Sequence, residues 1–121
     1  MANRVRIGMT ILAVPALLAG CGPNPIRDPA QLAAIRAEAR ALMADPPVDA
    51  SSRVPERRWP RAIASLRPEW VRIDADGVEI VTKIYFDDSW GYFVPRDPAR
   101  RPPARTGYSA VGEGIYWFHF S

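Results

Sequence analysis

The sequence predicts a small α+β domain, in which one longer helix and one short helix pack against an antiparallel sheet of about four strands. Three observations lead to this prediction. A segment with helical apolar spacing comes first, four short segments rich in β-branched and aromatic residues follow it, and the connections between those segments are mostly hairpin-sized. Parallel pairing would need crossovers of about a dozen residues, so antiparallel pairing is favoured.

The longer helix is expected over residues 28–44. Asp28 is placed to be its N-cap, Pro29 its first helical residue and Gln31 the capping-box position. Five apolar residues recur at helical spacing and form one stripe: Leu32, Ile35, Ala39, Leu42 and Met43. Asp45 precedes two prolines, which ends the helix. We expect the stripe to dock on the sheet, although a spacer helix or a helix that pairs with a partner would have the same pattern.

The segment from 45 to 58 is polar and punctuated by prolines, and we interpret it as a linker. A short second helix is expected over 61–66, and Pro68 should end it. All of the aromatic residues in the chain lie between 59 and 120. Residues 59–121 are therefore predicted to be a small, aromatic-rich α+β domain.

The strands are expected at residues 70–74, 78–86, 90–95 and 114–120. Asp76 and Gly77 supply a tight turn between the first two, and residues 87–89 a turn between the second and third. Strict alternation in the second strand would place one set of residues on a single face: Val78, Ile80, Thr82, Ile84 and Phe86.

The first 20 residues have the organisation of a secretion signal. Arg4 and Arg6 form a positive start, residues 7–18 are apolar, and small residues follow. The apolar run is shorter than the roughly 20 residues that a transmembrane helix needs. The sequence Leu18-Ala19-Gly20-Cys21 then resembles the lipobox of bacterial lipoproteins, in which an aliphatic residue and two small residues precede a cysteine.

That resemblance implies that residues 1–20 are a lipoprotein signal peptide, cleaved by the type II signal peptidase. The mature chain would begin at Cys21, whose sulfur would carry diacylglycerol, with a further acyl chain on the new amino group in many bacteria. The partner is then the lipid bilayer, and residues 21–27 are a short tether. Gly22 and Pro23 lack the Asp that retains such proteins at the inner membrane, which implies the periplasmic face of the outer membrane in a Gram-negative host. An ordinary secreted protein and a single membrane span are the alternatives.

The net charge of +3 does not indicate a nucleic-acid partner. Arg4 and Arg6 lie in the predicted signal, and without residues 1–20 the chain has fourteen basic against thirteen acidic side chains. The basic residues that remain are nearly balanced, so we expect no binding to nucleic acid.

No residue set predicts catalysis, a cofactor or a metal site. The lone histidine, His119, would have to be the base for Ser109, but the surrounding GYSAV departs from a nucleophile elbow and lacks its strand and helix context. DADG at 74–77 has the wrong charges around it for a calcium loop, and Asp87 with Asp88 is better explained by a turn. We therefore expect a protein that is not an enzyme.

Aromatic side chains are too numerous for a small sheet that is covered on one face, because alternation sends neighbours to opposite sides. Core packing explains part of this excess, and a solvated loop would explain the arginines of 95–106. The sequence otherwise indicates an interaction surface with these residues: Trp90, Tyr92, Tyr116, Trp117, Arg100 and Arg101. The functional prediction is a lipid-anchored, non-catalytic envelope protein that binds an envelope protein or polymer. A small periplasmic enzyme and an inhibitor or immunity-type lipoprotein are the alternatives.

Overall fold

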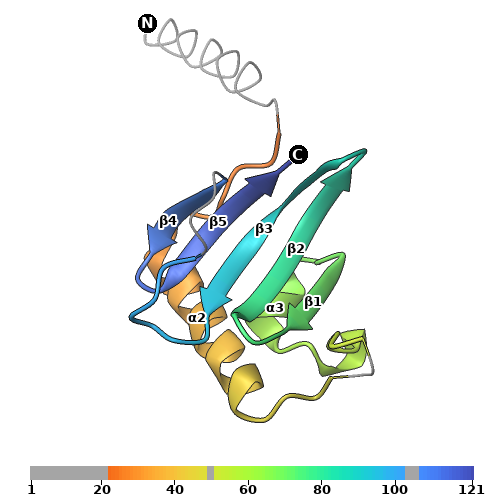
Figure 1. Ribbon diagram of the computed structural model, residues 1–121, viewed down its shortest axis with the longest axis vertical. Helices are drawn as coiled ribbons and strands as arrows, with labels where there is room; N and C mark the ends of the chain where they lie inside the picture. The colour runs from red at the N-terminus through yellow and green to blue at the C-terminus, as the bar shows by residue number, and fades with distance from the viewer. Residues whose placement is uncertain (1–21, 49–50, 103–106) are drawn as a thin grey trace, which may run out of the picture.

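Two α-helices lie on one face of a five-stranded antiparallel sheet (Figure 1). The computed structural model of the protein describes residues 22–48, 51–102 and 107–121. The predicted signal peptide and Cys21 lie outside them. The elements are α2 (Pro29–Ala44), the 3-10 turn η1 (Glu56–Arg58), α3 (Arg61–Ser65), β1 (Trp70–Ile73), β2 (Gly77–Tyr85), β3 (Asp88–Pro95), β4 (Tyr108–Gly112) and β5 (Ile115–Phe120).

The strand order is β1-β2-β3-β5-β4, and every neighbouring pair is antiparallel. The α+β class is thus confirmed, but the prediction of about four strands is wrong because β4 was missed. This strand lies at the sheet edge, is only five residues long and contains small residues on its exposed positions. Its sequence consequently lacks the apolar alternation that reveals a strand with a buried face.

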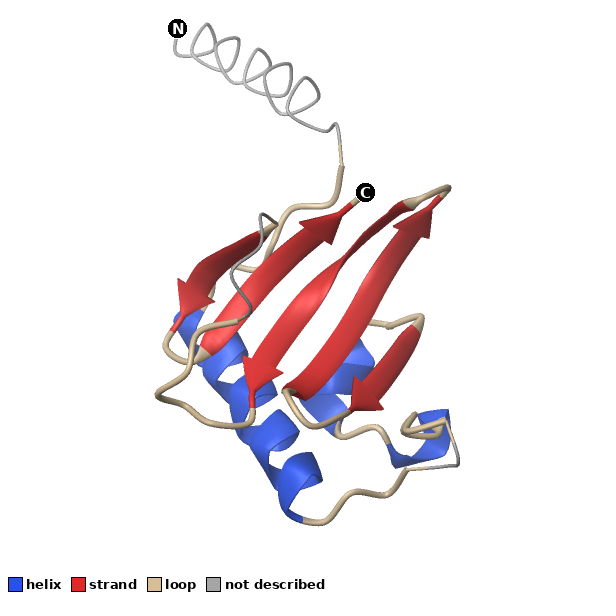
Figure 2. Cartoon of the chain, viewed as in Figure 1, coloured by secondary structure: helices blue, strands red, loops and turns tan. Residues whose placement is uncertain are grey.

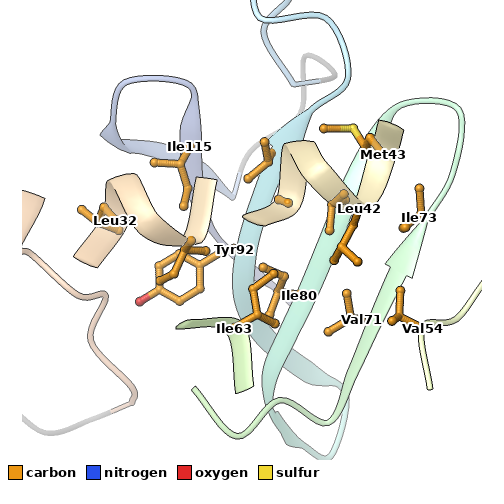
Figure 3. Packing of buried hydrophobic residues seen from close by; sticks show 14 residues of the cluster. Leu32, Leu42, Met43, Val54, Ile63, Val71, Ile73, Ile80, Tyr92 and Ile115 are labelled. Carbon is orange, nitrogen blue, oxygen red and sulfur yellow. The ribbon is translucent and has the colours of Figure 1, made fainter. Parts of the chain in front are cut away.

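The apolar stripe of α2 is buried against the sheet, as the docking interpretation requires. Its five predicted residues are the buried residues of the helix, and Ala39 and Ile35 have no exposed surface. Figure 3 shows Leu32 near Ile115 and Leu42 between α2 and the strands. Asp28 occupies the N-cap position, but its side chain makes no capping hydrogen bond, so the predicted capping box is not formed.

Helix α3 is fixed to α2 by a single carboxylate. Glu38 of α2 accepts hydrogen bonds from the backbone N–H groups of Ala62 and Ile63, both at 2.9 Å. These are donors in the first turn of α3 that have no partner inside the helix. Ile63 is thereby directed into the core that α2 and the sheet share.

The segment predicted as a linker is partly built into the fold. The Val54 N–H donates to the Val71 carbonyl at 2.9 Å, and the Ile73 N–H donates to the Ser52 carbonyl at 3.0 Å. Val54 is only 3% exposed and belongs to the main core. Residues near 53 therefore extend the β1 edge of the sheet. The sequence does not indicate this pairing, because the residues around Val54 are mostly polar.

The turn between β1 and β2 forms where the sequence predicts it. Asp74 Oδ1 accepts hydrogen bonds from the N–H groups of Asp76 and Gly77, at 2.9 and 3.2 Å. Gly77 has a φ of +152°, and a Cβ there would collide with the Val94 carbonyl oxygen. The position therefore requires glycine.

A β-bulge interrupts β2 and changes which side chains face the core. Val81 is in register with Gly91 and Lys83 with Trp90, so Thr82 is the extra residue. Beyond it the alternation shifts by one, which overturns the prediction that Ile84 and Phe86 share the core face with Ile80. The next turn is at residues 86–87, and β3 begins at Asp88, inside the turn expected at 87–89.

Replacing Glu38 with Ala should lower the free energy of unfolding by about 1–3 kcal/mol, because two partly buried N–H donors of α3 lose a charged acceptor. Urea denaturation followed by circular dichroism measures the change. Glu113→Ala is the matched control. Its carboxylate lies 3.9 Å from Arg36 and is almost fully exposed, so that variant should change stability by less than about 0.5 kcal/mol. Equal effects for the two variants would contradict the role assigned to Glu38.

Candidate interaction surfaces

Aromatic side chains make up much of the helix-free face of the sheet. Both helices cover the other face (Figure 2). A second apolar cluster of Val81, Phe93 and Phe118 is nevertheless buried on this side, beneath four partly exposed aromatic residues: Trp70, Tyr108, Tyr116 and Phe120. The sheet thus covers its open face with its own rings, which leaves a partly exposed aromatic surface. We call these seven residues the aromatic face.

Gly91 makes room for the ring at the centre of this aromatic face. A Cβ at Gly91 would lie 2.8 Å from the ring of Phe118 and would collide with the Ile80 carbonyl oxygen. Phe118 in turn stacks on Phe120 with the ring centroids 4.8 Å apart. Tyr108 meets the edges of both Phe118 and Phe120, at 6.3 and 5.1 Å. The rings therefore form one connected layer.

Two of the predicted surface residues belong to the helix-covered face instead. Tyr92 is only 2% exposed, which corrects its placement on an interaction surface. Burial raises the pKa of its hydroxyl above the usual value for tyrosine, although the hydrogen bond that it accepts from Ile26 opposes this rise. Trp117 packs edge-on against Tyr92, with centroids 5.0 Å apart, and is partly buried against the main core.

The remaining predicted residues are divided between two ends of the sheet. Tyr116 lies on the aromatic face, and Trp90 stacks on His119 with the ring centroids 4.6 Å apart. Arg100 and Arg101 are exposed and line a hollow beside the β1–β2 turn, which also includes Phe93 and Pro95. Tyr116 is in register with Phe93, which lines this same hollow, whereas Trp90 lies nearer the β2–β3 turn. The structure does not bring the predicted residues together into one surface.

His119 is engaged by an acidic partner that the sequence did not pair with it. Its Nε2 lies 3.1 Å from Asp88 Oδ1, across the β3–β5 pair. Ser109 is in register with Trp117, two residues from His119 along β5, so His119 is not its cross-strand partner. His119 also stacks on Trp90. These contacts join β3 and β5 at the end of the sheet. They do not pair a nucleophile with a base.

The segment that precedes α2 is docked on the domain. We call residues 22–28 the lead segment. The Ile26 N–H donates a hydrogen bond of 2.8 Å to the Tyr92 hydroxyl oxygen, and the Ile26 side chain packs against the main core. At the other end of the lead segment, a Cβ on Gly22 would lie 3.5 Å from the Trp90 ring. A stretch that the sequence describes as a tether therefore lies along the sheet.

An exposed apolar tip is the feature that sequence reasoning missed. Ile84, Tyr85 and Phe86, which we call the hairpin tip, are 38%, 59% and 85% exposed. They follow the bulge, at the end of β2 that extends beyond β1, since β1 pairs only with residues 78–81. The length of the second strand relative to the first was a signal that its last residues lack a neighbour on that side.

The backbone at Phe86 is in a conformation that bulky residues rarely adopt. Its φ is +55°, in the left-handed region that hairpin turns normally fill with Asn, Asp or Gly. The ring contacts the edge of the Tyr85 ring at 4.5 Å but is otherwise largely in solvent. The Phe86 side chain strains the turn and fills no core, so the stability of the domain does not explain it. This indicates a role outside the fold.

Within the described ranges, no three His, Cys, Asp or Glu side chains gather as a metal site would require. No helix in the same part of the chain is long and apolar enough to cross a bilayer. A comparison with models of protein families found no match, and comparisons with curated proteins and with solved structures found no significant one.

Replacing Phe86 with Asn should raise the free energy of unfolding by about 0.5–1 kcal/mol, because Asn tolerates a positive φ. The melting temperature, measured by calorimetry, should rise by a few degrees. Phe86→Ala is the control, since it removes the same ring but keeps the backbone strain. If Ala stabilises as much as Asn, the strain assigned to this position is wrong.

Proposed function

We propose that this protein is a lipoprotein, anchored in the bacterial envelope through acylated Cys21, and that its domain is a non-catalytic binding module. The observation that carries the proposal is the lipobox of residues 18–21, preceded by a positive start and a short apolar run. Two or three acyl chains would make a durable anchor, because each buried CH2 contributes about 0.8 kcal/mol. The absence of Asp after Cys21 supports the outer membrane in a Gram-negative host.

The docked lead segment supports a domain that is held close to the membrane surface. Gly22 lies beside Trp90, and Ile26 is bonded to Tyr92, so little free chain separates the domain from residue 21. Peptide geometry puts consecutive Cα atoms about 3.8 Å apart. A lipid on Cys21 would consequently hold this end of the sheet at the headgroup layer. A free tether would instead let the domain move away from the membrane surface.

The aromatic face supports the binding role. Aromatic rings that are partly exposed are typical of protein interfaces, and those of Trp70, Tyr108 and Tyr116 lie on a face that no described helix covers. The single histidine contacts Asp88 and Trp90, and the cross-strand partner of Ser109 is Trp117 and not His119, which favours binding over hydrolysis. We propose an envelope protein or polymer as the partner of this face.

Acylation can be tested by growing cells that express the full chain with an alkyne analogue of palmitate. The protein should become labelled, and intact mass should show a chain that begins at an acylated Cys21. Cys21→Ser should abolish the label, because only a thiol forms the thioether. A double variant, Cys21→Ser with Ser109→Cys, restores a thiol outside the lipobox and should stay unlabelled. Label that persists in Cys21→Ser would refute the anchor.

A photo-crosslinking amino acid placed at Tyr116 tests the aromatic face in living cells. We expect a discrete crosslinked product, because Tyr116 is partly exposed on this face. The control position is Arg57, which is exposed on η1 away from that face and should give no such product. Equal crosslinking at the two positions, or none at Tyr116, would count against a specific binding face.

A further inference from the structure

The hairpin tip and the start of the lead segment lie at the same end of the molecule. In Figure 1 the described chain enters at the end of the sheet where the β2–β3 turn projects. Gly22 lies beside the Trp90 ring, and Trp90 is in register with Lys83, three residues before Phe86. A strand rises about 3.3 Å per residue, so the tip extends roughly 10 Å beyond the backbone of Trp90, the residue whose ring lies beside Gly22.

We propose that the hairpin tip of Ile84, Tyr85 and Phe86 inserts into the lipid bilayer that holds the protein. This inference rests on the proposed acylation of Cys21, which would place a membrane at this end. The projecting end of the sheet would then meet the headgroups with its exposed apolar side chains. The acyl chains and the tip become two attachment points, which together fix the orientation of the domain.

The chemistry of the tip fits a bilayer interface. Tyrosine is enriched at membrane–water interfaces, because its ring is apolar and its hydroxyl is polar. Phe86 is the most exposed large apolar residue of the described chain. Lys83 and Asp87 flank the tip with opposite charges, and Asp88 is paired with His119. The tip therefore has no net positive charge, so the contact depends on apolar burial and not on anionic lipid.

The strained turn supports the same occupant. A positive φ at Phe86 disfavours a bulky side chain. Within the described structure the ring contact of Phe86 is with Tyr85, its neighbour in the chain. Burial in lipid would give the ring a role that the isolated domain does not. The basic loop with Arg100 and Arg101 lies by the β1–β2 turn, roughly 25 Å away along β2, and would face away from this bilayer.

The test uses the acylated protein, purified from envelopes and reconstituted in vesicles of phosphatidylethanolamine and phosphatidylglycerol. An environment-sensitive fluorophore is attached to Asp87→Cys at the tip, and separately to Ala75→Cys in the turn at the opposite end as the matched control. We expect a blue-shifted emission at position 87 and quenching by nitroxide-labelled lipid that is several-fold stronger than at position 75. The difference should persist in vesicles of phosphatidylcholine alone.

Phe86→Asn in the Asp87→Cys background should reduce the quenching several-fold, and this change cannot be assigned to unfolding because Asn relieves the strained turn. Equal quenching at 87 and 75, or no effect of Phe86→Asn, would overturn the proposal. So would protection of position 87 that appears without lipid and depends on protein concentration, since that indicates a second copy.

The intact mass of the protein tests the acylation of Cys21 separately from the insertion of the hairpin tip. An unacylated Cys21 would refute the anchor alone. In that case Cys21→Ser protein with the same two labels is mixed with vesicles of the same composition. Quenching at 87 but not at 75 would then still support the tip as a lipid contact, and no quenching at either position would overturn it.

Discussion

The packing of the α2 stripe across the sheet is the constraint on which the rest of the structure depends. Ile35 and Ala39 are fully buried, so this contact fixes the angle and depth of the helix. Glu38, on the neighbouring flank, then holds α3 by two free N–H groups of its first turn. The start of α2 also sends the lead segment back along the sheet, where Ile26 reaches Tyr92. One helix thus sets the core, the second helix and the direction from which the chain arrives.

A second constraint is that the sheet has two apolar faces and helices on only one of them. The aromatic face meets this demand by covering Phe93 and Phe118 with neighbouring rings, and it depends on Gly91 for space. Such a cover excludes less water than a helix does, and it leaves ring edges available to a partner. The same composition that made the core recognisable in the sequence therefore also produces the surface on which we place binding.

The hairpin tip is where local stability and the rest of the fold disagree. The bulge at Thr82 moves Ile84 out of the core, and the turn holds Phe86 in a backbone conformation that suits Asn or Gly. At the Asp74–Gly77 turn, by contrast, local preference agrees with the structure. Disagreement of this kind concentrates where a residue serves something other than folding, which is why the tip outweighs the basic loop as a contact with lipid.

The sequence by itself determined the α+β class, the position of α2, its buried stripe and the first hairpin turn, because periodicity and turn chemistry are local. It also contains residues 18–21, which resemble a lipobox and on which the proposed anchor rests. Only the tertiary structure decided that β4 forms the edge, that Tyr92 is buried while Phe86 is exposed, and that Asp88 meets His119. A bulge, a strand edge and a pairing across strands depend on register, and register is fixed by the whole sheet and not by any one segment.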